Sequence, residues 1–167
     1  SMTSVVDNNS RVSALEVANA LAIYFAEHSS GQFKDKYITF SSRPQFVDFS
    51  KCKTLHDKLQ TALAHDEMAN TNIEKVFDLI LTTAISKHMS QDDLPRNVLI
   101  ISDMEFDHCT TCGNDDGWGY RNKPNQKLFE VIAKRYANAG YKMPRLVFWN
   151  VASLTGTIPV KENELGV

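Results

Sequence analysis

Apolar residues recur along much of the chain with the spacing of amphipathic helices. The clearest stripe lies between Ile73 and Ala84, where apolar side chains fall three or four residues apart. A second stripe crosses residues 13–27 and predicts a largely buried helix, and a third predicts a helix over residues 125–139. The second stripe comprises Leu15, Ala18, Ala22 and Phe25, widened by Val17, Leu21 and Tyr24; the third comprises Leu128, Phe129, Ile132 and Tyr136.

Two threonines stand where helices are expected to begin. Thr54 is followed three residues later by Asp57, and Thr71 by Glu74. This spacing is typical of a capping box, in which the two side chains bond to each other's backbone N–H groups. The sequence therefore predicts that helices open at Thr54 and at Thr71.

The remaining apolar segments are short and predict strands. Residues 36–41 alternate in polarity and, together with residues 45–49, predict a hairpin. Residues 97–102 and 145–151 are more continuously apolar, which is typical of buried parallel strands. Residues 157–160 predict a short edge strand, because a proline there is hard to place inside a sheet.

The expected order of elements is helix, hairpin, helix, helix, strand, helix, strand. Strands and helices alternate in the second half, which favours a three-layer α/β fold: a mostly parallel sheet with helices on both faces. The chain opens on a loop and a helix, whereas a doubly wound fold normally begins with a central strand. We therefore interpret residues 1–167 as one domain that lacks its first strand and is a fragment of a longer protein.

Composition excludes several classes of protein. Apolar residues make up 43% of the chain and charged residues 23%, with a net charge of −2, so there is no general basic footprint for nucleic acid. No apolar run reaches membrane-spanning length, and the start lacks the pattern of a signal peptide. The three cysteines do not suggest a disulfide framework, so we expect a cytoplasmic protein.

A cluster of acids directly follows the strand at residues 97–102. Asp103, Glu105 and Asp107 come at its carboxyl end, and open α/β sheets bind ligands at that edge. Carboxylate oxygens are the ligands that hard divalent cations prefer. The sequence therefore points to this edge as the functional site, and to a metal as its first candidate ligand.

The segment after these acids, residues 108–123, is rich in glycine and predicts a long loop. Cys109 and Cys112 form half of a zinc site, but structural zinc needs four ligands, so a free thiol pair is favoured. Trp118 and Tyr120 either recognise a partner beside the acidic edge or fold back over the sheet.

Several segments together resemble a von Willebrand factor A-type domain, and within that superfamily the DUF2828 family, which is related to the A-type domain of Ro/TROVE ribonucleoproteins. The resemblance is most specific at the strand ending in Ser-Asp-Met-Glu-Phe-Asp and at the strand Leu-Val-Phe-Trp-Asn. These segments are residues 14–21, 37–41, 70–74, 98–107, 141–150 and 157–160.

The resemblance implies a metal-ion-dependent adhesion site that holds Mg²⁺ or Mn²⁺. Its parts are an Asp-x-Ser-x-Ser motif after the first strand, a threonine in a later loop and an aspartate after the fourth strand. Thr71 matches the threonine and Asp103 the last aspartate, while Ser1 is either the final serine of the first motif or the remnant of an expression tag. The first motif is not intact in either case.

Binding is a better interpretation than catalysis, because no nucleophile or oxyanion donor accompanies the acids. The resemblance implies a contact between the metal and an acidic group on another protein. One alternative is an RNA-associated module, which needs a basic face containing Lys123, Lys127, Lys134 and Arg135. A less favoured alternative is a metal-dependent hydrolase that uses Asp103 with the two acids after it.

Overall fold

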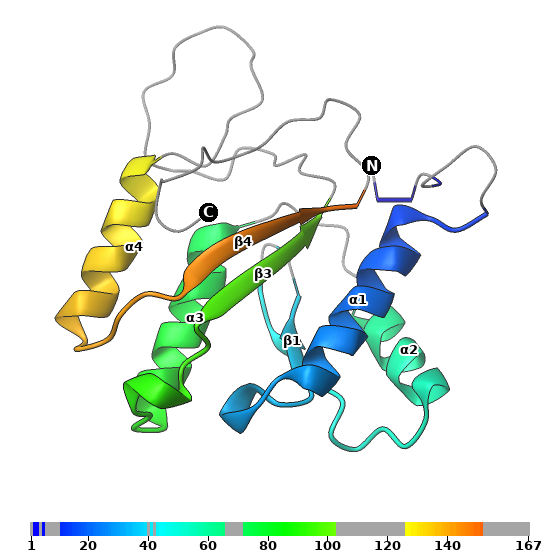
Figure 1. Ribbon diagram of the computed structural model, residues 1–167, viewed down its shortest axis with the longest axis horizontal. Coiled ribbons are helices and arrows are strands. Elements are labelled where there is room, and N and C mark those ends of the chain that lie inside the picture. The colour runs from blue at the N-terminus through cyan, green and yellow to red at the C-terminus, as the bar shows by residue number, and fades with distance from the viewer. Residues whose placement is uncertain are drawn as a thin grey trace, which may run out of the picture.

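The computed structural model describes residues 2–3, 5, 11–39, 41, 43–65, 72–102 and 126–151. The helices and strands appear in the predicted order, with two additional 3₁₀ turns (Figure 1). The helices are α1 (Ala14–His28), α2 (Leu55–Ala64), α3 (Ile73–Ser86) and α4 (Gln126–Asn138); the strands are β1 (Lys36–Ile38), β2 (Phe46–Asp48), β3 (Asn97–Ser102) and β4 (Arg145–Asn150); the 3₁₀ turns are η1 (Gly31–Phe33) and η2 (Gln91–Asp93).

Local hydrogen bonds explain where the helices begin and end. The predicted capping box at α2 is confirmed: Thr54 Oγ1 accepts from Asp57 N at 3.1 Å, and Asp57 accepts from Thr54 N at 2.9 Å. Ser13 and Glu16 form an equivalent box at α1. After the carboxyl end of α4, Gly140 adopts φ +82°, the left-handed conformation that favours glycine after a helix.

Thr54→Ala is expected to lower the free energy of unfolding by about 1 kcal/mol, because it leaves a backbone donor of α2 without its partner. For a chain of this length the melting temperature should fall by about 2–4 °C. Hydrogen bonds from the backbone N–H and the side chain of Thr54 hold the pKa of Asp57 below its usual value. The contribution of this carboxylate to the stability of the folded state is therefore present at neutral pH and is lost as pH falls through the folded pKa.

Differential scanning fluorimetry measures this effect. Thr82→Ala is the matched control, since Thr82 is exposed within α3 and caps no helix. An equal loss of melting temperature in both variants would contradict a capping role for Thr54.

The described strands form two separate two-stranded sheets. β1 and β2 make the predicted antiparallel hairpin, with Tyr37 opposite Val47. β3 and β4 make the predicted parallel pair, in register from Asn97 opposite Arg145 to Ser102 opposite Asn150. The fold is therefore mixed α/β, and the expected three-layer architecture around one mostly parallel sheet is not confirmed, because no described strand joins the hairpin to the parallel pair.

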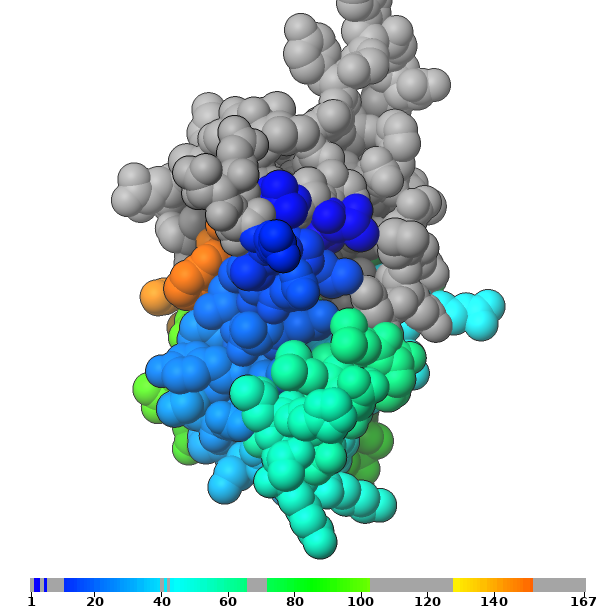
Figure 2. All heavy atoms as spheres, turned by 90° about the vertical axis from the view of Figure 1, so that its right-hand side faces the viewer, coloured from blue at the N-terminus to red at the C-terminus, as the bar shows by residue number. Residues whose placement is uncertain are grey.

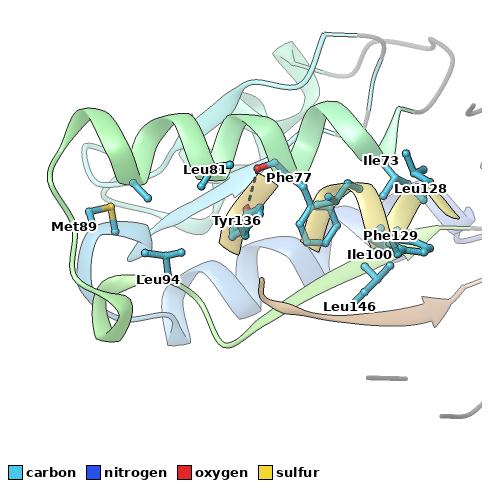
Figure 3. Close-up of a cluster of buried hydrophobic side chains, with 12 residues drawn as sticks. Ile73, Phe77, Leu81, Met89, Leu94, Ile100, Leu128, Phe129, Tyr136 and Leu146 are labelled. Atoms are coloured by element: carbon cyan, nitrogen blue, oxygen red, sulfur yellow. Dashed lines mark hydrogen bonds between the residues drawn. The ribbon is translucent and has the colours of Figure 1, made fainter. Parts of the chain in front are cut away.

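The larger hydrophobic cluster lies where α3 and α4 pack on one face of the parallel pair (Figure 3). Phe77 and Tyr136 are fully buried at its centre, and the Tyr136 hydroxyl donates to the Phe77 carbonyl at 2.9 Å. Ile100 and Leu146 bring one face of β3 and β4 into the same cluster. The apolar stripes predicted for α3 and α4 are therefore confirmed as the faces that make this core.

A second cluster joins α1 and α2 to the hairpin, and Figure 2 shows these two helices side by side on one face of the molecule. Its buried residues are Ile23, Ala26, Val47, Phe49 and Ala62. Among the described residues, none belongs to both clusters.

None of the helices in the described part of the chain has the length and hydropathy needed to span a bilayer.

Candidate functional site

The residues predicted to form the site lie outside the described part of the chain. How these residues lie relative to one another therefore stays a prediction. The structure does describe the strand and helix ends next to some of them in the sequence. These residues are Ser1, Thr71, Asp103, Glu105, Asp107, Cys109, Cys112, Trp118 and Tyr120.

The carboxyl edge, defined here as Ser102 with Asn150 and Val151, is the described part of the predicted site. β3 and β4 end in register there, and Val151 N donates to the Ser102 carbonyl at 3.0 Å. Ser102 itself is buried. The residue directly before Asp103 in the sequence is thus held at the end of a paired strand, as the apolar run had predicted.

The start of α3 differs from the expected capping box at Thr71. The helix begins at Ile73, and the side chain of Asn72 accepts from Lys75 N at 3.0 Å. Glu74 instead reaches Arg135 on α4, with an Oε1 to Nη2 distance of 2.6 Å. The structure thus places the helix cap at Asn72 rather than at the predicted Thr71, because Asn72 is an equally good cap. Thr71 itself lies outside the described residues.

Arg135 joins α4 to α3 through two carboxylates. Its Nη1 lies 3.0 Å from Asp78 Oδ1, in addition to the contact with Glu74. These acceptors, Asp78 first, raise the pKa of the guanidinium further above its usual value. An arginine neutralised in this way contributes little to a basic face, so the structure adds nothing to the RNA hypothesis at this position. Lys134 is exposed.

Within the described ranges, no group of three or more His, Cys, Asp or Glu side chains is arranged to hold a metal ion. Cys52 is half-buried, and its Sγ lies 3.5 Å from Thr61 Oγ1.

Shifted pKa values among the described residues have structural causes. Backbone and side-chain donors of Ser13 and Ser90 lower the pKa of Glu16 and Asp93, both of which cap the start of a helix or 3₁₀ turn. Burial raises the pKa of Tyr136, whose hydroxyl is used in packing α4 onto α3. Shifted pKa values often mark catalytic groups, but those of Glu16, Asp93 and Tyr136 belong to caps or to the core.

The structure has two hollows that the sequence did not predict. One, of about 960 Å³, opens at the amino ends of β3 and β4, with Arg96 and Arg145 in its lining. The other, of about 720 Å³, lies between the hairpin and β3. Neither has a signal in the periodicity, because both arise where elements distant in sequence meet.

The chain belongs to the DUF7788 family, a domain of unknown function, whose profile matches residues 1–167. It is similar to the uncharacterized protein L728 of Acanthamoeba polyphaga mimivirus, with 28% identity over 168 residues. That alignment covers 99% of this chain but 27% of the viral protein, so the chain spans about a quarter of its relative. No solved structure matches the chain.

This family assignment overturns the resemblance to von Willebrand factor A-type domains and to DUF2828. A buried strand that ends in acids is a local pattern that unrelated α/β families share, so it did not identify the family. Neither the DUF7788 description nor the name of the viral relative points to catalysis.

Proposed function

We propose that this domain is a protein-binding module in which a divalent cation at the carboxyl edge bridges to an acidic group of the partner. The support comes from three residues that the structure describes, each adjacent in sequence to a predicted metal ligand. Ser102, which precedes Asp103, ends β3; Asn72, which follows Thr71, caps α3. Met2, which follows Ser1, accepts a hydrogen bond from Leu15 N in the first turn of α1.

These element ends lie on the same side of the molecule. Figure 1 shows β3 and β4 running toward the end of the domain at which α1 and α3 begin. Helix N-termini carry partial positive charge, which favours an approaching carboxylate. In the proposal, these helix starts favour the carboxylate of the partner, while the acids that follow β3 hold the cation.

In this proposal Asp103 is the principal acidic ligand and Thr71 supplies a hydroxyl oxygen. Glu105 and Asp107 add negative charge near the cation. Mg²⁺ and Mn²⁺ both accept oxygen ligands of this kind and keep open positions for water or an incoming carboxylate. The bound cation would supply the electrostatic attraction that holds the partner.

Saturating Mn²⁺ is expected to raise the melting temperature of the domain by about 5–10 °C. A ligand at 100 times its dissociation constant stabilises the folded state by about 2.7 kcal/mol, and each kcal/mol shifts a chain of this size by about 2–4 °C. Asp103→Asn should remove the shift and Thr71→Ala should reduce it. Scanning fluorimetry with Mn²⁺, and then with excess chelator, measures these changes.

Asp92→Asn is the matched control, because Asp92 is an exposed aspartate in η2, next to the amino end of β3. It should keep the full response to Mn²⁺. The proposal fails if Mn²⁺ leaves the melting temperature unchanged, or if Asp103→Asn responds as strongly as the unsubstituted protein.

A further inference from the structure

The hollow at the amino ends of β3 and β4 lies at the opposite end of the parallel pair from the carboxyl edge (Figure 1). Two segments form much of its wall: the segment between α3 and β3, which contains η2, and the connection from α4 to β4. Its volume of about 960 Å³ is within the range typical of ligand pockets. We call it the basic hollow and define it by six of its lining residues: Arg96, Lys142 and Arg145, with Ala133, Ala137 and Met143.

Hydrogen bonds between these two segments fix the shape of the basic hollow. Gln91 Oε1 accepts from Lys142 N at 2.6 Å, and Gln91 Nε2 donates to the Lys142 carbonyl at 3.4 Å. The Tyr141 hydroxyl donates to the Met89 carbonyl at 2.7 Å. Both segments are thus held in place, so a ligand would bind without the cost of first ordering the wall.

Three cations and one acid contribute charge to the basic hollow. Arg96 and Arg145 are neighbours across the start of the two strands, because Arg145 N donates to the Arg96 carbonyl at 2.8 Å. Lys142 precedes β4 in the same connection. Among the described lining residues, Asp92 is the single carboxylate, which leaves the lining with a net charge of +2. The whole chain carries −2, so the charge of this hollow is opposite in sign to that of the chain.

The charged groups of these three cations have no partner in the described part of the chain. They take no part in the ion pairs that hold Lys36, Lys58 and Arg135. Cations near a helix end can instead bind its last carbonyls, but none of the three side chains donates to a described carbonyl at the end of α4. All three residues are exposed. Unpaired charges of one sign in a concave surface attract a compact ion of opposite sign.

The part of the basic hollow formed by α4 is apolar. Ala133 and Ala137 lie on the same face of α4, and their small side chains leave space beside the helix. Met143 and Pro144 continue this surface, and Met143 also packs against the larger hydrophobic cluster. A ligand that carried only charge would leave this apolar surface uncovered. The hollow is therefore suited to an anionic group that is joined to an apolar one.

We propose that the basic hollow binds a small molecule that carries a phosphate monoester on an apolar group. A phosphate monoester has a charge of about −1.5 to −2 at neutral pH, which complements the net charge of the lining. Its oxygens match the planar donor fork of arginine, and a lone carboxylate would need one arginine rather than two.

A macromolecular polyanion is a less suitable ligand for this hollow. RNA and anionic membranes are bound by many cations spread over an extended surface. Here the cations are confined to one hollow, and η2 at its wall contributes the exposed acids Asp92 and Asp93. These acids would repel an extended anionic surface more than a small ligand seated between the arginines.

Phenyl phosphate is the probe, because it joins a phosphate monoester to one aromatic ring. Titrated into the 167-residue chain, it should give saturable shifts in the amide NMR signals of Arg96, Lys142 and Arg145, while the amides of α2 stay unchanged. It should bind about tenfold more tightly than inorganic phosphate, since the ring covers the apolar surface of α4. No divalent cation is present in the titration, so the result does not depend on the metal proposal.

Substitutions separate the two parts of the basic hollow. Arg96→Gln and Arg145→Gln should each weaken the binding of phenyl phosphate by about tenfold, because each removes a charged donor. Arg43→Gln is the matched control, since Arg43 is exposed and lines neither described hollow. Ala137→Leu places a good helix former at an exposed position of α4. It should remove the advantage of phenyl phosphate over inorganic phosphate and leave the binding of inorganic phosphate unchanged.

Several results would overturn the proposal. These are the absence of saturable shifts at the basic hollow, equal affinities of the Arg96→Gln, Arg145→Gln and Arg43→Gln variants, and equal affinities of the unsubstituted protein for phenyl phosphate and inorganic phosphate. Competition tests the macromolecular ligands, with a single-stranded RNA that lacks terminal phosphates and with vesicles of phosphatidylcholine and phosphatidylserine. If either displaces phenyl phosphate at a lower concentration of phosphate groups, the cations serve an extended polyanion and the proposal is wrong.

Discussion

Replacing Phe77 by alanine is expected to lower the free energy of unfolding by about 3–5 kcal/mol. The side chain is 0% exposed and lies at the centre of the cluster between α3, α4 and the parallel pair. Its ring meets that of Tyr136 edge to face, with 6.3 Å between the ring centroids. The substitution would remove this contact and leave a cavity that two packed helices cannot readily close. Urea denaturation followed by circular dichroism measures the loss.

Ile85→Ala is the matched control for this substitution. Ile85 lies in the same helix but is 49% exposed, so its truncation opens no cavity. We expect a change below about 1 kcal/mol for an exposed position of this kind. A loss for Phe77→Ala as small as that of the control would show that this cluster does not hold the fold together.

The agreement between sequence and structure is best where a helix has one narrow apolar stripe. All six apolar positions predicted for α3, from Ile73 to Ala84, are buried. Periodicity was sufficient there because the opposite face of the helix is polar and only one orientation buries the stripe. The same holds for α4, where Ile132 and Tyr136 are fully buried.

The agreement is poorer for α1, whose apolar residues cover most of its circumference. The structure buries Ala14, Ala18, Ile23 and Ala26, whereas Tyr24 is 53% exposed. The predicted stripe shares only Ala18 with this set. When several faces of a helix are apolar, packing against the hairpin and α2 decides which one is buried, and periodicity carries no information about those neighbours.

In the sheets and at the site, the features that depend on residues close in sequence were the ones that the sequence could predict. The hairpin follows from two short strands close together in the sequence, and the parallel pair from the strand–helix–strand order. The gap between the two sheets depends on contacts between segments far apart in sequence, which no local pattern records. Similarly, the strand before Asp103 was predicted correctly, while the helix cap was not, because Thr71 and Asn72 are adjacent and both suit that position.

Replacing Phe49 by alanine is expected to loosen the hairpin, α1 and α2 while leaving the other half of the domain intact. Phe49 is 1% exposed, and its ring lies 5.4 Å from that of Tyr37. A loss of about 3 kcal/mol corresponds to faster exchange by about two orders of magnitude for amides that open with this cluster. Because the two clusters share none of the described residues, exchange at amides such as that of Val47 should accelerate, whereas exchange at that of Ile132 should not.

Hydrogen exchange in the Phe49→Ala and Phe77→Ala variants separates two descriptions of the domain. If exchange accelerates equally in both clusters, the 167-residue chain unfolds as one cooperative unit, and the prediction of local loosening is wrong. If exchange in Phe49→Ala accelerates only around Val47, the two clusters open separately and the two halves of the domain are weakly coupled.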